Sequence, residues 1–265
     1  MKIARTVGEI RELLRPLRAN TRIGLVPTMG AFHGGHVALF QTARAECGAV
    51  VASLFVNPSQ FGDPADLAAY PRDEARDARI AEQSGIDMLF APTVDEMFPE
   101  GYTTWIESAG AARGLESDHR PGHFRGVATV CVKLFTIAGP QVAFFGQKDA
   151  QQIAVVKQVV RDLNLDLDIR VVPTVRDVDG LALSSRNTRL SPGDRERARA
   201  IPRAIEAGLA AHRSGGDPVA AAREALGDLV PDYVTVAGFA DAPTLVIAAR
   251  VGGTRLIDNA PLDRR

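Results

Sequence analysis

The chain has 265 residues, of which 46% are hydrophobic and 24% are charged, and its formal net charge is -1. This composition is typical of a folded globular protein of one large or two smaller domains, and it excludes a disordered chain. The charge gives no reason to expect a nucleic-acid or membrane-surface partner, and no apolar run is long enough to cross a membrane. Only two cysteines occur, Cys47 and Cys131. We therefore expect no disulfide framework and no zinc cluster, which fits a cytoplasmic protein.

Residues 1–18 predict a short strand followed by an amphipathic helix, with no apolar signal core. Through the first two-thirds of the chain, apolar runs alternate with helical patterns, which indicates parallel strands joined by crossover helices. Because the runs are almost continuously apolar, we expect both faces of the sheet to be covered, as in a doubly wound α/β fold. The expected strands are 23–27, 50–56, 88–90, 142–145 and 169–172, and the expected helices are 35–47, 73–84, 124–138 and 149–162.

The composition changes after Asn187. The sequence from Ser191 to Asp194, SPGD, is a helix-start signal, and it predicts an alanine-rich helix that continues to about His212. A second helix is expected near 217–228, and three strands at 233–237, 244–249 and 254–257. Helices followed by strands are typical of a separate, smaller α+β domain. We therefore predict a larger N-terminal domain at 1–175 and a smaller C-terminal domain at 176–265, with the irregular segment 98–122 as the wall of a cleft.

The most informative motif follows the first long strand. A strand, a glycine-rich turn and a helix start form an anion site in many α/β proteins, because free backbone N–H groups and the helix dipole both favour phosphate. The motif is neither a dinucleotide-binding turn nor a P-loop. It is HxGH, and its two imidazoles add further donors to phosphate. The residues of this turn are Met29, Gly30, Ala31, Phe32, His33, Gly34, Gly35 and His36.

Polar residues follow three later points of the chain. Asn57 and Gln60 come after the second long strand, where they can bind a hydroxyl or a carboxylate or form an Asx-Pro turn. Lys148 follows the strand at 142–145, and Gln152 lies one turn into the next helix. Lys148 can bind phosphate, or it can be solvated while Asp149 caps the helix. The segment 183–187, LSSRN, can be a clamp on polyphosphate oxygens or a polar linker.

Two further groups allow a functional and a structural interpretation. The basic cluster His119, Arg120, His123 and Arg125 can line an anion site, or it can be a helix start with solvated charges. Asp77 can place a carboxylate near magnesium, or it can lie on an exposed helix face.

Taken together and in this order, PTMGAFHGGH, FVNPSQF, YPR, RPGHFRGVATV, FFGQKDAQQ and LSSRN resemble the pantoate–β-alanine ligase family over most of residues 20–190. That family belongs to the HxGH nucleotidylyltransferase superfamily. The resemblance implies a Rossmann-like sheet, a homodimer and an ATP-dependent ligation with Mg²⁺. Pantoate attacks the α-phosphate to form pantoyl adenylate, and β-alanine then displaces AMP to form pantothenate.

The resemblance also implies roles for individual residues. The catalytic residues are His36 (as proton donor), His33, Lys148, Ser184 and Arg186. Pantoate and β-alanine are bound by Gln60, Gln152 and Asn57. The ATP site comprises the turn from Met29 to His36 together with Gly146, Gln147, Lys148, Asp149, Val175, Leu183, Ser184, Ser185 and Arg186. Arg76 stands beside Asp77 where the family has an acidic run, and this leaves magnesium ligation by Asp77 open.

Two other functions remain to be compared. A simple nucleotidylyltransferase would share HxGH but would not need paired glutamines for a hydroxy acid. A nucleotide sensor or an RNA-binding synthetase fragment would lack phosphate ligands or carry a basic surface. The histidines, Lys148 and Arg186 are all present and the net charge is close to zero, so the ligase is favoured.

Overall fold

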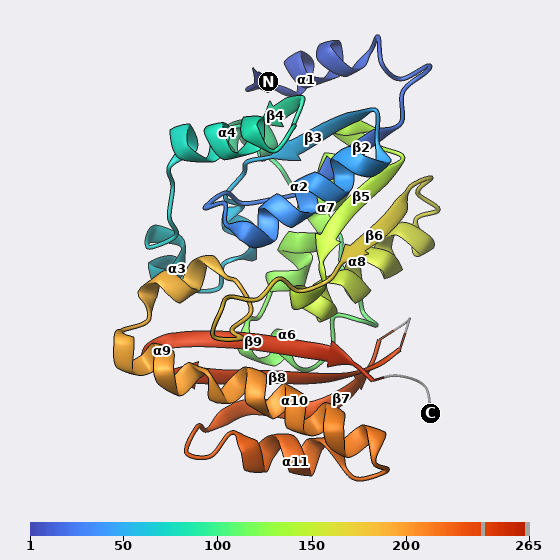
Figure 1. Cartoon of the computed structure of the whole chain (residues 1–265). Helices are drawn as coiled ribbons and strands as arrows, with labels where there is room; N and C mark the ends of the chain where they lie inside the picture. The colour runs from blue at the N-terminus through green and yellow to red at the C-terminus, as the bar shows by residue number, and fades with distance from the viewer. Residues whose placement is uncertain (240–241, 263–265) are drawn as a thin grey trace. The chain divides into compact units, whose positions relative to one another are not determined.

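The computed structural model describes residues 1–239 and 242–262, and the chain folds as two compact units (Figure 1). Unit 1 comprises residues 1–146 and 151–172, and unit 2 comprises residues 147–150 and the chain from 173 onward. The division between the two units after Val172 lies close to the domain boundary that we predict after residue 175. Residues 147–150 also belong to unit 2, although we predicted them in the N-terminal domain.

Unit 1 contains a six-stranded parallel sheet with the order β1-β4-β3-β2-β5-β6. Each expected strand forms, and the strand expected at the N-terminus is β1. The order of the strands reverses at β2, which pairs with β3 on one side and β5 on the other. In sheets of this kind, ligands bind at the carboxyl ends of the strands beside such a switch point. The strands are β1 (Lys2–Ala4), β2 (Ile23–Val26), β3 (Ala49–Ser53), β4 (Met88–Phe90), β5 (Val142–Gly146) and β6 (Asp168–Val172).

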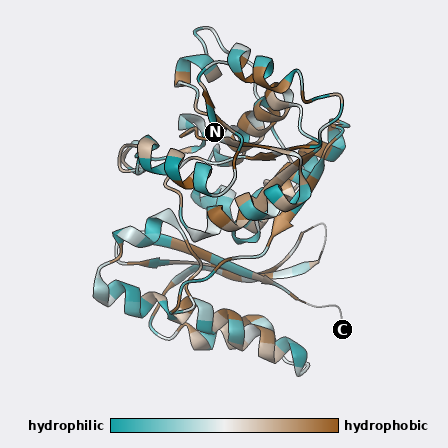
Figure 2. Ribbon diagram, turned by 45° about the horizontal axis from the view of Figure 1, so that its top comes forward, coloured by the Kyte–Doolittle hydropathy of each residue, from teal (hydrophilic) through white to brown (hydrophobic). Residues whose placement is uncertain are grey.

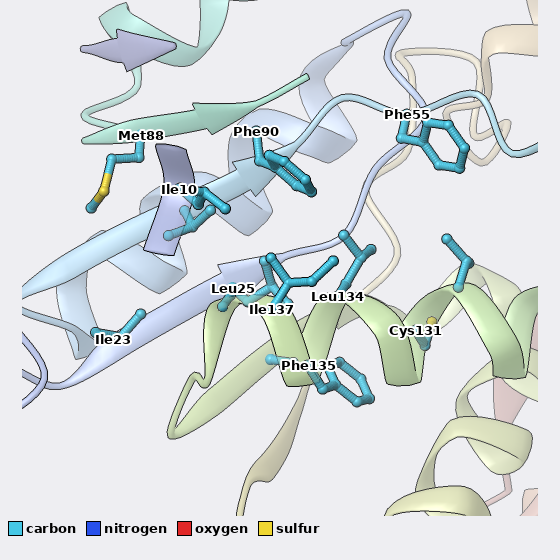
Figure 3. Packing of buried hydrophobic residues seen from close by; sticks show 14 of the residues in the cluster. Ile10, Ile23, Leu25, Phe55, Met88, Phe90, Cys131, Leu134, Phe135 and Ile137 are labelled. Carbon is cyan, nitrogen blue, oxygen red and sulfur yellow. The ribbon is translucent and has the colours of Figure 1, made fainter. Parts of the chain in front are cut away.

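Helices cover both faces of this sheet, because successive residues of a strand point to opposite sides. Leu25 of β2 packs with α1 (Val7–Leu14) and α7 (His123–Ala138), as Figure 3 shows. The next residue, Val26, belongs instead to the cluster of α2 (Gly34–Glu46) and α4 (Glu74–Gln83). Residues of α8 (Ala150–Asp162) join the first of these clusters. The doubly wound α/β fold is therefore confirmed.

Short helices connect the larger elements of the chain. The segment 98–122 is largely irregular, as expected, and contains only α6; its role as a cleft wall stays a prediction. The short helices are η1 (Pro58–Gln60), α3 (Pro64–Ala68), α5 (Val94–Met97), α6 (Glu116–His119), η2 (Gln147–Asp149) and η3 (Ser185–Arg189).

Unit 2 is an α+β unit built on a three-stranded antiparallel sheet, β7 (Pro231–Gly238), β8 (Pro243–Val251) and β9 (Thr254–Pro261). Its helices are α9 (Pro192–Ala198), α10 (Ala200–Arg213) and α11 (Pro218–Ala225). Ser191 caps α9 as expected, since its side chain accepts a hydrogen bond from the Asp194 N–H. Apolar residues run along the strands of both units (Figure 2).

The single helix predicted from Pro192 to His212 was wrong, because the structure has two helices that meet at Arg199. Pro202 explains the break. Proline has no N–H to donate to the carbonyl four residues earlier, that of Ala198, and its ring crowds that carbonyl. A helix can therefore restart shortly before Pro202 but cannot run continuously through it.

The two cysteines lie in the interior of the protein. Both cysteines are free and buried, and burial raises the pKa of the Cys131 thiol to about 12. Among residues 1–239 and 242–262, no helix is long and apolar enough to span a membrane.

Candidate active site

The HxGH turn lies at the carboxyl end of β2, beside the switch point of the sheet. Thr28 ties the start of the turn to the end of β3: its N–H donates to Ser53 Oγ at 3.0 Å, and its hydroxyl donates to the Ser53 carbonyl. The Phe55 N–H returns a hydrogen bond to the Thr28 carbonyl at 3.2 Å. The loops after β2 and β3 are therefore held together, which brings the HxGH turn close to the segment that carries Asn57 and Gln60.

The middle of the turn has an unusual backbone conformation. Gly30 has φ +87° and Ala31 has φ +54°, both in the left-handed region that residues with a Cβ avoid. Glycine is required at position 30, because an added Cβ would lie 2.6 Å from Leu54 Cδ1 and 2.8 Å from Asp77 Oδ2. Asp77 therefore lies against the turn and not on an exposed helix face, and its side chain is 1% exposed.

His33 and His36 begin α2, and each uses one ring nitrogen within the turn. His33 is the N-cap residue, and its Nδ1 accepts a hydrogen bond from the Gly35 N–H at 3.1 Å. His36 Nδ1 accepts from the His33 N–H at 3.3 Å, so the pair forms a capping box built from imidazoles. A ring nitrogen that accepts carries no proton, and each neutral ring therefore carries its proton on Nε2. Both rings can donate to a phosphate only through Nε2.

Gln60 lies beside this turn and is 7% exposed. Its Nε2 lies 3.0 Å from the sulfur of Met29, and its Oε1 accepts from Asn57 Nδ2 at 3.0 Å. The structure thus brings Met29, Asn57 and Gln60 together.

Asn57 is 1% exposed, and it holds the loop that carries Gln60. Its Nδ2 also donates to the Gly126 carbonyl at 3.2 Å, and its Oδ1 accepts from both the N–H and the hydroxyl of Ser59. The Asx-Pro turn considered from the sequence is therefore present. The amide of Asn57 is thus used within the protein, where it contacts Gln60. Direct binding of a substrate by Asn57 stays a prediction.

His123, the first residue of α7, also holds Gln60. Its Nδ1 lies 2.8 Å from the Gln60 carbonyl oxygen, which can only accept, so Nδ1 carries the proton. Its Nε2 lies 3.1 Å from Arg120 and accepts from that guanidinium. His123 begins α7, as the helix-start interpretation of the sequence expected, but at 5% exposure it is not a solvated charge. The anion-site interpretation of the basic cluster stays a prediction. A histidine directly before a strongly apolar helix was the signal for burial.

The two consecutive glutamines of α8 have different surroundings. Gln151 is 6% exposed, and its Nε2 donates to the carbonyls of Ala111, Arg113 and Gly114, while its Oε1 accepts from the Glu116 N–H at 3.0 Å. It anchors the irregular segment before α6, a role that the sequence reasoning did not find. Gln152, the predicted pantoate ligand, is partly exposed.

In unit 2, β9 holds the segment that carries Lys148. Asn259 Nδ2 donates to the carbonyls of Gln147 (3.1 Å) and Lys148 (2.8 Å), and Asn259 Oδ1 accepts from Gln147 Nε2 at 3.1 Å. Lys148 Nζ lies 3.3 Å from Asp149 Oδ1. The sequence reasoning missed Asn259, since nothing local to the DNAP stretch relates it to residues more than a hundred positions earlier.

The neighbouring residue of β9, Asp258, holds the second polar segment of unit 2. Both of its oxygens accept from the guanidinium of Arg176, at 2.7 and 3.0 Å, and this hydrogen bonding raises the pKa of Arg176. The Leu183 N–H donates to the Val175 carbonyl at 3.0 Å, which closes the loop between them. Ser184 then caps η3, because its hydroxyl accepts from the Arg186 N–H at 3.2 Å. Unit 2 thus gathers Val175, Leu183, Ser184, Ser185 and Arg186 on one loop.

We expect Asp258→Ala to destabilise unit 2. Asp258 is 2% exposed and the Arg176 side chain is 32% exposed, so the substitution leaves a half-buried guanidinium without its bidentate partner. The expected loss is about 2 kcal/mol, below the range for fully buried pairs because water reaches Arg176. Thermal unfolding followed by circular dichroism measures it. The control is Asp228→Ala, whose carboxylate is 81% exposed and 3.6 Å from Arg197. Equal unfolding midpoints for the two variants would contradict the expectation.

With these positions established, comparison with known proteins identifies the family. A family model described as pantoate-beta-alanine ligase matches residues 2–261. The chain is 45% identical over 279 residues to the pantothenate synthetase of Pelotomaculum thermopropionicum, covering 99% of each chain. This chain belongs to the pantoate–β-alanine ligase family.

Solved structures agree with this assignment. The pantothenate synthetase from Thermus thermophilus superposes with a TM-score of 0.92 at 42% identity, covering 98% of this chain and 99% of that one. A pantoate-beta-alanine ligase from Francisella tularensis, solved as a complex with beta-gamma ATP and beta-alanine, gives a TM-score of 0.86 at 34% identity, covering 98% of this chain and 97% of that one. The family that the motifs indicated is confirmed, and the chain is a ligase with a Rossmann-like fold.

Proposed function

We propose that this protein condenses pantoate with β-alanine to give pantothenate, AMP and pyrophosphate. In the first step a pantoate carboxylate oxygen attacks the α-phosphorus of ATP, and the bond to pyrophosphate breaks. In the second step the β-alanine nitrogen attacks the acyl carbon of pantoyl adenylate, a C–N bond forms, AMP leaves and the amine releases a proton. The observation that carries the proposal is the HxGH turn at the switch point with Gln60 beside it, in a chain that matches the family over residues 2–261.

Both nucleophiles belong to substrates, so the protein has to align the reactants and stabilise charge. His33 and His36 donate from Nε2 to phosphate oxygens, which the capping box supports because it places the other ring nitrogen in the turn. Gln60 and Gln152 bind pantoate. Lys148, Ser184 and Arg186 bind the polyphosphate, together with the backbone of the two segments that carry them. His36 is the proposed proton donor.

Magnesium enters this proposal as part of the Mg-ATP substrate. Protein sites for Mg²⁺ commonly supply one or two carboxylates and leave the rest to phosphates and water. Among residues 1–239 and 242–262, no group of three or more His, Cys, Asp or Glu side chains could hold a metal ion. Both oxygens of Asp77 accept backbone N–H groups, so ligation of magnesium by Asp77 would compete with these hydrogen bonds and stays a prediction. We propose that the phosphate oxygens of ATP and water supply most of the ligands of the ion.

The proposed setting is a cytoplasmic homodimer with small-molecule partners only. Two buried free thiols suit a reducing compartment, and a net charge of -1 gives no attraction to nucleic acid. Sedimentation of the purified protein measures the oligomeric state.

The function is tested with purified protein, Mg²⁺, ATP and pantoate. We expect pyrophosphate release that requires pantoate, and AMP and pantothenate in equal amounts after β-alanine is added. A nucleotidylyltransferase would form the adenylate but would not transfer the acyl group to β-alanine. A folded protein without pantoate-dependent pyrophosphate release would overturn the proposal.

A further inference from the structure

Asp77 belongs to α4, more than forty residues away from the turn that it contacts. Its Oδ2 accepts the Ala31 N–H at 2.7 Å and its Oδ1 accepts the Phe32 N–H at 2.8 Å. Consecutive amides that converge at left-handed residues form a nest, a concave site that favours an anion. Here the anion is the buried carboxylate of Asp77. The amides of Ala31 and Phe32, which we assigned to ATP from the sequence, are therefore already used within the protein.

Arg76, the preceding residue of α4, contacts the same segment. Its guanidinium donates to the Phe32 carbonyl at 3.1 Å and lies 3.6 Å from Asp77 Oδ1. Both polar groups of the Phe32 backbone are thus held by α4. The Phe32 side chain is fully buried and packs edge-on against Phe40, with ring centroids 5.1 Å apart. Phe32 is held from the backbone and from the side chain, immediately before His33.

We propose that Asp77 is a positioning residue for the nucleotide site: it holds Ala31 in its left-handed conformation and thereby sets where His33 and His36 stand. This inference rests on the proposed function, since it assigns to the turn the binding of ATP phosphates. An alanine rarely adopts φ +54° without support, and two charge-assisted hydrogen bonds provide that support. In this role Asp77 acts through the histidines and does not touch the substrate. The contacts of Arg76 fit this role, because its guanidinium lies 3.6 Å from the Asp77 carboxylate and also donates to the Phe32 carbonyl of the turn.

The test compares Asp77→Asn with Asp73→Asn. Both substitutions remove one charge from α4 and keep the shape of the side chain. Asp73 is the exposed N-cap of α4, and asparagine caps as well as aspartate does. At position 77, the new NH₂ group would face one of the two backbone N–H groups, so one hydrogen bond is lost and two donors meet.

Two half-reactions are measured for each variant. The first is pantoate-dependent exchange of pyrophosphate into ATP, and the second is the reaction of chemically prepared pantoyl adenylate with β-alanine. Asp77→Asn is expected to lower the rate of pyrophosphate exchange on the order of 100-fold, since misplacement of phosphate-binding groups by about 1 Å has effects of this size. The rate of the reaction with β-alanine is expected to fall by less than about threefold. Asp73→Asn is expected to match the wild type in both.

The outcomes separate this proposal from the function on which it rests. Wild-type protein without pantoate-dependent exchange would overturn the function itself. If the wild type catalyses pyrophosphate exchange, a folded Asp77→Asn protein with the same exchange rate as Asp73→Asn overturns the positioning role. A parallel fall in both half-reactions also overturns it, because a purely structural defect lowers the amount of folded enzyme. If Asp77→Asn does not fold, the half-exposed Arg76→Gln is used: a loss of about tenfold confined to exchange supports the proposal, and unchanged exchange overturns it.

Discussion

Replacing His36 with alanine is expected to lower pantoate-dependent pyrophosphate release by at least about 100-fold, the size found when one preorganised donor to a charged transition state is removed. The Nδ1 of His36 accepts a backbone hydrogen bond in the turn, so the donation to phosphate that we propose comes from Nε2–H. Its loss removes a donor aimed at charge that develops as pyrophosphate leaves. The measurement is the single-turnover rate of pyrophosphate formation with saturating ATP and pantoate.

His36 also helps to cap α2, and a control has to separate this from catalysis. Glutamine at the same position is the usual residue of a capping box, so His36→Gln is expected to keep the helix start but not the imidazole. We expect His36→Gln to unfold at nearly the wild-type temperature and to form pyrophosphate as slowly as His36→Ala. His212→Ala, in the last turn of α10, is the control for loss of a histidine elsewhere. Wild-type rates in His36→Gln would show that the cap, and not the donor, is what the reaction needs.

Gly126→Ala is expected to damage the pantoate site and the stability of unit 1 together. An added Cβ at position 126 would lie 2.4 Å from the Ser59 carbonyl oxygen and 2.7 Å from the Gln60 backbone nitrogen. These are backbone atoms of the loop that carries Gln60, so the loop has to move away from α7. We expect a loss of about 2–3 kcal/mol in unfolding free energy, the upper range for an overpacked core. We also expect at least about a tenfold rise in the KM for pantoate, since displacement of a binding group by tenths of an ångström weakens its hydrogen bonds.

The matched control for this substitution is Gly193→Ala. Both glycines lie in helices, but an added Cβ at position 193 meets nothing within 4 Å. Alanine has the higher helix propensity, so Gly193→Ala is expected to be neutral or slightly stabilising. Denaturant unfolding and steady-state kinetics with varied pantoate measure both effects. A Gly126→Ala protein with the stability and KM of Gly193→Ala would show that the loop tolerates the shift, and that the close approach of α7 does not position Gln60.

Local patterns in the sequence predict most of the fold. The strands that form β2 to β5 are almost continuously apolar, and β6 alternates between charged and apolar residues. The predicted bounds of all five agree with the structure to within a few residues. The start of α9 was predictable from Ser191, because a cap acts on its own first turn. The break at Arg199 was predictable in principle from Pro202, but the alanine-rich pattern on both sides outweighed it. The polar motifs were recognisable because they follow strand ends, where parallel sheets place their ligands.

The contacts between residues of the candidate site were not predicted from the sequence. Asp77 and the HxGH turn are linked by backbone amides, which leave no trace in residue type, so the carboxylate looked like a metal ligand or a surface charge. Asn259 joins the Lys148 segment, and Asp258 holds the loop that begins at Val175, although both stand more than eighty residues away in the chain. In the sequence His123 belongs to a cluster of basic residues, yet its ring is buried against the Gln60 carbonyl. Such pairs depend on which elements pack against one another, and a single sequence does not state that.

Residue order alone therefore established the α/β class, the strand runs and the identity of the HxGH turn with its candidate partners. The fold class and the strands follow from apolar periodicity and capping, and the assignment of the turn and its partners follows from the resemblance of the motifs to a known family. The tertiary structure decided which amides of the turn bind Asp77, which ring nitrogens of His33, His36 and His123 accept hydrogen bonds, and which residues hold the segments of Gln60 and Lys148. Those properties arise from hydrogen bonds between segments far apart in the chain, and they exist only once the sheet has brought the segments together.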